Sequence, residues 1–515
     1  MKILSTTLKD QRGAALVISL VFMVLLTILG IAGIMISSTD LKVAKNEISS
    51  SKSLYIAEAG LERGEIGALE DLQYDANIAN STFNSTTLGT TFISSPTAGT
   101  FYSLGSFAFG GGSYTVEVMF YNTNGGGLEP AEAKVRSTGV GPDGSTSVLE
   151  SFFYAEDVSI WNNAIFGGGG GSGSIPINGN VKIAGSIHIL GNGVTPTTTV
   201  FYNQTGDCKN NHTGMDTDLA NCFFYGTSSD LKSKFRIRNG KVDMTVGSGF
   251  IGQSTSYYKG IYVGAGVDGG GGVNADILGG NNGVGGTGSQ NLYAEEGASS
   301  PKPYDLGVSV TMPSIDTTLY NSNCLDLTTA ADQTSALVSG SLTLDDGASY
   351  QVSATSGDGS ISYDGSASPH ILSISGLVKV RTLTMNKNAD LQVSGKGILY
   401  VSDPTGVTVY INNDIYSTGA TWPTTDLLVI VSHGDMQIGS SSQLEITGAF
   451  FSEGDVYVNM QTEIAGTIVC STFNIGSQVP KIWQTPSLAA NLPALVPGNG
   501  SNWVITEKTW RQDTM

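Results

Sequence analysis

The first feature of the chain is an apolar run near its start. From Ala14 to Ile36 the sequence holds 23 residues without a charge, and its only hydroxyl side chains are Ser19 and Thr27. As a helix this run is about 30 Å long, which matches the hydrocarbon core of a bilayer. It is longer than the apolar part of a cleaved secretory signal, about 7–15 residues, so a cleaved signal is the weaker alternative. The pattern predicts a transmembrane helix over 14–36.

The short segment before the run is basic. Residues 1–13 contain Lys2, Lys9 and Arg12 against one acid, Asp10. Positive charge beside a membrane helix favours the cytoplasmic side, so we expect the N-terminus in the cytoplasm, the helix in the inner membrane and everything after it outside.

The junction of leader and run resembles a known processing site. Gln11-Arg12-Gly13 stands directly before the apolar run, and the stretch QRGAALVISLVFMVLLTILGIAG with YIAEAGLERG at 55–64 is similar to the PilX-type minor pilins of type IV pili. The resemblance implies that a prepilin peptidase cuts between Gly13 and Ala14 and that the new N-terminus is methylated. A plain single-pass anchor with an accidental glycine is the simple alternative.

One position departs from the major pilins of this family. Major pilins carry a glutamate five residues into the mature chain, where this sequence has Ile18. PilX-like minor pilins and the K-type pseudopilins of type II secretion also lack it. By that resemblance we expect a tip or initiating position, not a place in the repeating shaft.

Helical spacing continues beyond the membrane run. No proline interrupts residues 37–72, and apolar residues recur at helical intervals, which predicts an amphipathic helix to about 72. Three alternating segments follow, and turn signals rich in glycine separate them. They predict a three-stranded antiparallel sheet with strands near 113–121, 133–138 and 147–155. With the helix they form a pilin-like module over 14–156.

Short strand patterns separated by Gly or Asn fill the rest of the chain. Residues 160–330 are predicted to be β-rich, with Gly-rich and cysteine-loop insertions, and residues 331–515 to be β-solenoid-like. A repeat near 20 residues is what β-helix coils need. Two intervals between glycines indicate this repeat: Gly376 to Gly395, and Gly448 to Gly466.

The predicted fold class is therefore α+β and mainly β. A long pilin-like helix with a small antiparallel sheet precedes a β-helix or solenoid-like domain with loop insertions. A β-sandwich is the alternative for the second part. Three tryptophans near the C-terminus, Trp483, Trp503 and Trp510, are predicted to cap the end of the solenoid.

The composition limits the kinds of partner that the chain can bind. The chain has 68 glycines, 13% charged residues and a net charge of −19. Nucleic acid is excluded as a partner, because a phosphate backbone needs clustered Lys and Arg. An acidic surface of this kind suits an extracellular protein.

Two of the cysteines suggest a disulfide. Cys208 and Cys222 bracket a polar loop of thirteen residues, and outside the cell the default for such a pair is a disulfide. A metal loop built from His212, Asp216 and Asp218 is the alternative. It lacks EF-hand spacing, and no metal is predicted. Cys470, in an apolar strand, is expected to be a buried thiol.

Catalytic chemistry is not visible in the sequence. The four histidines are far apart, and no nucleophile, phosphate-binding or haem motif stands in its required context. We expect no enzyme activity and no cofactor. Tyrosines at 257, 258 and 262 belong either to a solvated, flexible insertion, which the composition favours, or to a surface that binds carbohydrate or protein.

These patterns predict a minor pilin that supports pilus assembly and surface adhesion from a tip or priming complex. Its expected partners are other minor pilins, a tip adhesin and the prepilin peptidase. Two alternatives stay open: a type II secretion pseudopilin, and a membrane-tethered β-helix protein that binds or cleaves polysaccharide.

Overall fold

The structure, a computed structural model of the chain, describes residues 4–75, 82–83, 85–89, 91–92, 99–120, 131–168, 177–178, 181–191, 199–202, 207–244, 249–264, 277–278, 291–295, 304–306, 310–328, 337–345, 351–356, 359–386, 390–417, 419–440, 443–475, 479–500 and 502–513. The predicted Gly-rich insertion near 269–286 lies almost entirely outside these residues.

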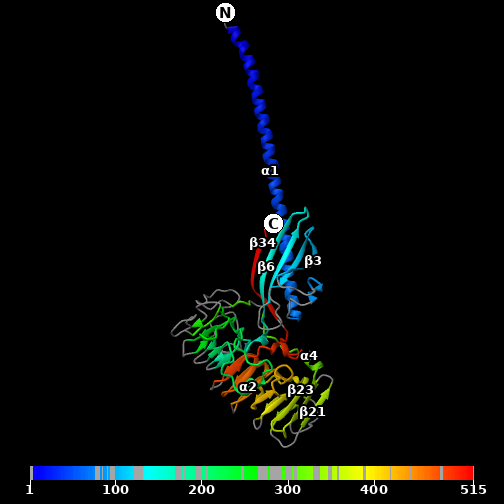
Figure 1. Ribbon diagram of the computed structural model, residues 1–515, viewed down its shortest axis with the longest axis vertical. Coiled ribbons are helices and arrows are strands. Elements are labelled where there is room, and N and C mark those ends of the chain that lie inside the picture. Colours follow the sequence, from blue (N-terminus) through cyan, green and yellow to red (C-terminus); the bar gives the residue numbers. More distant parts are fainter. Residues whose placement is uncertain are drawn as a thin grey trace.

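A single helix, α1 (Leu4–Asp75), forms the start of the chain. Figure 1 shows its first half projecting alone from the rest of the molecule and its second half lying on a sheet. In the projecting half, Ser19 and Thr27 donate hydrogen bonds to the carbonyl oxygens of Leu16 and Met23 at 2.8 and 2.7 Å. The helix therefore satisfies these hydroxyls itself, which an apolar solvent requires.

The sheet beneath α1 is antiparallel and has five strands in the order β3-β4-β5-β6-β34. The three predicted strands are β4 (Gly112–Phe120), β5 (Ala131–Val140) and β6 (Thr146–Asp157). Sequence analysis missed the two outer strands, β3 (Phe101–Phe109) and β34 (Trp503–Asp513).

The position of β34 corrects two predictions. Residues 503–513 do not belong to the solenoid-like region, because they pair with β6 from Trp503↔Asp157 to Asp513↔Val148. Trp503 and Trp510 therefore do not cap that region. An edge strand needs only one paired neighbour and tolerates charge on its exposed side, which fits the polar sequence of this strand.

Glycines let α1 approach the sheet closely. A Cβ on Gly60 would lie 2.3 Å from Ser137 Oγ, and a Cβ on Gly64 would lie 2.6 Å from a methyl carbon of Val135. From the sheet side, a Cβ on Gly139 would lie 2.4 Å from the backbone nitrogen of Ala57. Around these contacts the module buries its core, which includes Ile56, Leu61, Val116, Val135 and Phe153.

Most other strands stack in three parallel ladders, in which each strand pairs with the strand one coil further along. The central ladder contains β23 (His370–Val380, C-terminal half), β26 (Lys396–Val401), β29 (Leu427–Ser432), β31 (Glu445–Val458), β32 (Glu463–Ile475), β7 (Ile165–Gly167), β10 (Ile187–Ile189), β13 (Lys234–Ile237) and β16 (Gly260–Val263).

The long strands β31 and β32 bend through all three ladders. The second ladder contains β20 (Ser341–Leu344), β24 (Thr382–Met385), β27 (Val407–Ile411) and β30 (Asp435–Ile438), and β30 pairs with β31. A separate four-stranded sheet is formed by β8 (Ile177–Asn178), β11 (Thr199–Tyr202), β14 (Lys241–Asp243) and β17 (Ile277–Leu278). The third ladder contains β23 (N-terminal half), β25 (Leu391–Ser394), β28 (Ile415–Ser417), β31, β32, β33 (Lys481–Trp483), β9 (Lys182–Ala184), β12 (Asp207–Lys209) and β15 (Phe250–Ile251).

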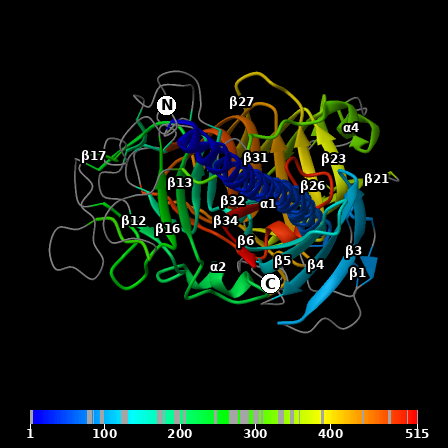
Figure 2. The ribbon, with the colours of Figure 1, turned by 90° about the horizontal axis from the view of Figure 1, so that it is seen from above.

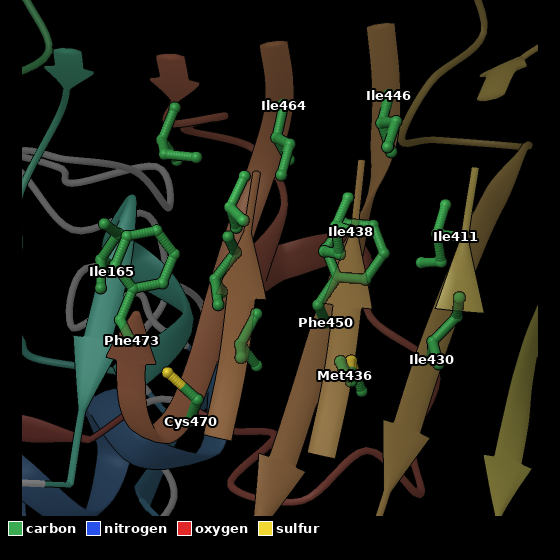
Figure 3. Close-up of a cluster of buried hydrophobic side chains, with 14 of the residues drawn as sticks. Ile165, Ile411, Ile430, Met436, Ile438, Ile446, Phe450, Ile464, Cys470 and Phe473 are labelled. Carbon is green, nitrogen blue, oxygen red and sulfur yellow. The ribbon is translucent and has the colours of Figure 1, made fainter. Parts of the chain in front are cut away.

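The registers test the predicted repeat. Gly448 pairs with Gly466, as the sequence predicted, but Gly376 pairs with Gly397 and not with Gly395. Aligned apolar residues fill the space between the ladders, and Figure 3 shows Ile411, Ile438, Ile446 and Ile464 in this common core. The small slip arises because coils of this region differ in loop length, so glycine spacing alone does not fix the register.

The order of the coils differs from the order of the chain. Strand β7 pairs with β32 on one side and with β10 on the other, and β33 pairs with β9. The coils of residues 165–263 therefore continue the stack that residues 325–483 begin (Figure 2). The predicted regions 160–330 and 331–515 share one hydrophobic core and are not two separate units.

A second core covers the outside of the central ladder. Segments 304–306, 310–322 and 485–497 cross this face. Trp161 and Trp422 fill it at 0% and 1% exposure. Strands such as β29 are therefore buried on both faces and apolar throughout, as in other covered parallel sheets.

The remaining elements are short. A hairpin of β21 (Gln351–Ser356) and β22 (Gly359–Asp364) pairs antiparallel with β23 and covers one end of the stack. The others are β1 (Thr82–Phe83), β2 (Thr91–Phe92), β18 (Leu325–Asp326), β19 (Leu337–Val338), α2 (Thr217–Cys222), α4 (Thr317–Ser322), η1 (Ile160–Asn162) and η2 (Ala489–Asn491).

The helix–sheet contact gives a first prediction. Gly64→Ala places a methyl group against Val116 and Val135, so we expect a loss of about 1–3 kcal/mol in unfolding free energy, typical of an overpacked core. Thermal unfolding of the detergent-solubilised chain measures the change. Ile66→Ala, at a half-exposed position of the same turn, is the control, and an equal effect of both substitutions would contradict the close approach.

Candidate functional site

The largest exposed apolar surface of the described chain is the projecting half of α1. Its most apolar window has a mean hydropathy of 2.9 and no buried residue, which by length and composition is enough to cross a membrane. Large side chains along it are more than half exposed, among them Leu16 at 72% and Ile34 at 72%. Such a surface is stable only inside a lipid or protein environment, so the segment is an insertion or assembly surface.

The predicted processing residues lie at the start of this surface. A Cβ on Gly13 would meet nothing within 4 Å, so packing inside the chain does not require a glycine there. Ala14 is exposed, and Ile18 is 56% exposed at the position where a glutamate was expected in major pilins. The geometry leaves Gly13 and Ala14 accessible to a peptidase.

Two chain crossings join the helix-and-sheet module to the stacked coils. Strand β6 leaves through Asp157 and Val158, and the chain returns through Asn502 into β34. Val158 N donates to Asn502 O at 2.9 Å, and Asn502 N donates to the Asp157 carboxylate at 2.9 Å. The two crossings are therefore bonded to each other as well as to their own strands.

A buried ion cluster lies beside these crossings. Glu156 on β6 contacts Lys234 Nζ at 2.5 Å and Arg236 at 3.3 Å, and Arg236 also binds Asp305 at 2.8 Å. Burial alone would raise the pKa of Glu156, but the charges of Arg236 and Lys234 lower it from 4.5 to about 2. The cluster connects the sheet to β13. His188 lies beside it, with its Nε2 atom 2.8 Å from the hydroxyl of Tyr304, and burial lowers the pKa of His188.

Strand β34 is held to the module by charges on both sides. Lys508 contacts Glu65 of α1 at 2.6 Å and Glu62 at 3.1 Å. Arg511 contacts Glu150 of β6 at 2.8 Å, and Glu150 is 2% exposed. Although burial would raise the pKa of Glu150, hydrogen bonds from Arg136 and Arg511 lower it.

The predicted disulfide is not formed. Cys208 on β12 points into the core between the ladders, whereas Cys222 at the end of α2 packs in the outer core. The strands between the inner and the outer core separate the two thiols. Burial raises the pKa of both thiols. Cys470 is buried, in agreement with its prediction.

The loop between these cysteines also differs from the alternative metal site. His212 is 5% exposed, its Nδ1 accepts from Ser228 N at 2.8 Å and its Nε2 bonds Gln484 O at 2.7 Å, so both ring nitrogens are occupied. Asp216 and Asp218 instead lie near Glu445, with oxygen atoms all within 4.8 Å. Three carboxylates of this kind can hold a hard cation such as Ca²⁺. Burial and the neighbouring acids raise the pKa of Glu445.

The predicted recognition tyrosines are mostly inside the protein. Tyr258 is 0% exposed and donates to Gly185 O at 2.7 Å, and Tyr262 is 6% exposed. Tyr257 stacks on Tyr293 with ring centroids 6.0 Å apart. Instead, Phe224 and Tyr225 form an exposed aromatic pair after α2, at 55% and 62% exposure, with centroids 4.9 Å apart.

Sequence analysis missed the residues that join the two parts of the protein. Glu156, Arg236 and Asp305 are separated by 80 and 69 residues along the chain, so no local motif links them. For β34 a signal did exist, since residues 503–506 are the aromatic and β-branched types that strands favour.

Comparisons with known proteins agree with this geometry. Residues 12–62 match the family described as PilX N-terminal. Among solved structures, the competence-associated pilin ComZ from Thermus thermophilus is similar over 90% of this chain and 98% of its own, with a TM-score of 0.55 and 16% identity. At that identity the likeness shows the fold alone. No curated protein matches the sequence. The chain thus has a PilX-like N-terminal segment, and its overall fold resembles that of the competence-associated pilin.

The ion cluster gives a second prediction. Glu156→Gln leaves Lys234 and part of Arg236 without their partner, so we expect a loss of about 3 kcal/mol in unfolding free energy at neutral pH. Because the folded-state pKa of Glu156 is below its ordinary value of 4.5, its contribution is complete above pH 4.5 and disappears as the pH falls toward 2.

Unfolding free energies measured between pH 7 and pH 2.5 test this expectation. The difference between the native chain and Glu156→Gln should shrink on acidification. Glu58→Gln, at an exposed position of α1, is the control and should show a small, pH-independent difference. A constant difference for Glu156→Gln would contradict the role given to the ion cluster.

Proposed function

We propose that this protein is a minor pilin that a prepilin peptidase cuts after Gly13 and that then joins the tip or priming complex of a type IV pilus. Before assembly, α1 anchors the chain in the inner membrane with its N-terminus in the cytoplasm. After assembly the stacked coils face outward, where they contact a tip adhesin or a surface. The proposed mechanism is assembly and binding, without catalysis.

The observation that carries this proposal is the form of α1. One half is an apolar helix with no buried residue, and the other half is packed by glycines onto an antiparallel sheet. A helix of this kind can leave a membrane and enter a filament without refolding, because its head is held by the second half alone. The match of residues 12–62 to the PilX N-terminal family supports the same reading.

We further propose that the stacked coils form a β-helix whose role is to extend the binding surface away from the filament. Three parallel ladders with a shared apolar core support this assignment. In Figure 1 the stack lies at the far end of the sheet from the projecting helix. A rigid coil stack displays loops at a fixed distance from the membrane helix, which suits a tip component more than a shaft subunit.

The link of ComZ to competence does not carry over readily to this chain. A surface that binds DNA needs clustered cations, whereas this chain has 25 Lys and Arg against 44 Asp and Glu. The type II secretion alternative has no specific support, since the comparisons name a PilX family and a competence-associated pilin. We therefore favour a ligand other than nucleic acid.

The processing step can be tested directly. We expect the mature N-terminal peptide from native membranes to begin at methylated Ala14, and only in cells that contain the prepilin peptidase. Gly13→Leu should block the cut and leave folding unchanged, because space around Gly13 is open. Gly33→Leu, the same enlargement further along the same exposed helix, should be cut normally. Peptide mass spectrometry measures all four samples, and an N-terminus at Met1 in the native chain would remove the proposal.

The exposed aromatic pair gives a test of adhesion. Replacing Phe224 and Tyr225 together by alanine removes apolar area that the fold does not use, so we expect weaker surface binding and an unchanged melting temperature. Phe109→Ala, at a half-exposed aromatic position on β3, is the matched control. Attachment of piliated cells to abiotic and glycan-coated surfaces is the measurement, and equal attachment of both variants would place the adhesive surface elsewhere.

A further inference from the structure

The exposed side of α1 carries a regular repeat that its own sheet does not use. Counting every seventh residue from Ile34 gives Leu41, Ile48 and Tyr55. These four side chains are 72%, 74%, 58% and 66% exposed. Of the four large apolar residues exposed between positions 37 and 55, only Val43 lies off this line. A period of seven places them in a single stripe along a helix.

Small residues fill the second line of the same repeat. Gly30, Ser37, Ala44 and Ser51 follow one another at intervals of seven and stand between the large residues. A Cβ on Gly30 would meet nothing within 4 Å. Large and small positions that alternate in this way let two helices approach closely, in lipid as well as in water. Together the two lines form a seam, here called the heptad seam, over residues 30–55.

The heptad seam faces away from the chain's own sheet. Residues that contact the sheet, such as Ser53, Ala57 and Gly60, are buried. At 100° per residue they lie on the side of the helix opposite Tyr55 and Ile48. A second helix can therefore reach the seam from the side of α1 that the sheet does not cover, and Figure 1 shows the first half of α1 clear of the sheet.

Charges beside the seam identify the partner. Acidic Asp40 and Glu47 stand on one flank, and basic Lys45 and Lys52 stand on the other. In the described part of the chain none of these four residues forms an intrachain ion pair. In a parallel pair of heptad helices, each residue on the first flank meets the residue five positions further on in its partner. That rule brings Asp40 to Lys45 and Glu47 to Lys52 of a second copy, whereas an antiparallel pair would bring acid to acid.

We propose that the heptad seam pairs two copies of this chain, parallel and in register, while both are in the membrane. The proposal rests on the membrane insertion assigned under the proposed function, which gives every copy the same orientation. Self-complementary charges favour a second copy over an unrelated helix. The two heads lie on the outer sides of such a pair, because each sheet is opposite its own seam.

Cross-linking between single cysteines tests the contact. In a Cys324→Ser background, which removes the cysteine that is not buried, Ile48→Cys should form a disulfide-linked dimer of the full chain on mild oxidation of native membranes. Asn46→Cys, two residues away and exposed on the opposite side of the helix, should remain monomeric. Equal cross-linking at both positions, or none at Ile48→Cys, would overturn the proposal.

A charge exchange tests parallel self-pairing. A copy with Asp40→Lys and Glu47→Lys should lose co-purification with itself, and so should a copy with Lys45→Glu and Lys52→Glu. The two variants together should pair again, because every flank contact is then between opposite charges. Self-pairing of either variant at the native level, or a cross-linked product whose mass shows a different pilin, would overturn the proposal.

The same samples separate this inference from the proposed function. N-terminal peptide mass and membrane fractionation are measured for each variant. A chain that is in the membrane and cut after Gly13, yet does not cross-link, rejects the dimer alone. A chain that is absent from the membrane rejects the proposed function as well.

Discussion

The pairing of β34 with β6 holds this protein in its overall form. It joins the last strand of the chain to the sheet that α1 covers, so residues 158–502 are an insertion between two neighbouring strands. Both ends of the stacked coils are thereby fixed to one rigid edge, and the bond between Val158 and Asn502 closes the gap between them. Without this pairing the coils would be attached through a single crossing, and their direction relative to the membrane helix would be free.

Ion pairs reinforce that edge in two directions. Lys508 links β34 to the acids of α1, and Arg511 links it to Glu150 on β6. Glu156 extends the same edge to Arg236 in the coils. Glu150 and Glu156 are each shared between cations, so these charges set the mutual position of sheet and stack more than they add to total stability.

Local patterns made the helix and the three inner strands predictable. The apolar run and the position of Gly13 are read within a few residues of sequence. The errors came from contacts between distant segments. Strand β34 pairs with residues more than 300 positions earlier. Gly376 was expected to pair with Gly395, but it pairs with Gly397, two residues further along the chain. Cys208 and Cys222 are close in sequence but on opposite sides of a strand wall, and Tyr258 looked exposed because its neighbours are polar.

The permuted order of the coils has a consequence for how the chain reaches its native state. Strand β7 needs β32 as one of its two neighbours, yet about 300 residues separate them in the chain. During synthesis the first coils must wait, with one edge unpaired, until nearly the whole chain has been made. Contacts of such long sequence separation slow folding, and until they form an unpaired strand edge can associate with other chains. The charge of −19 is well suited to keep that intermediate from associating during the delay.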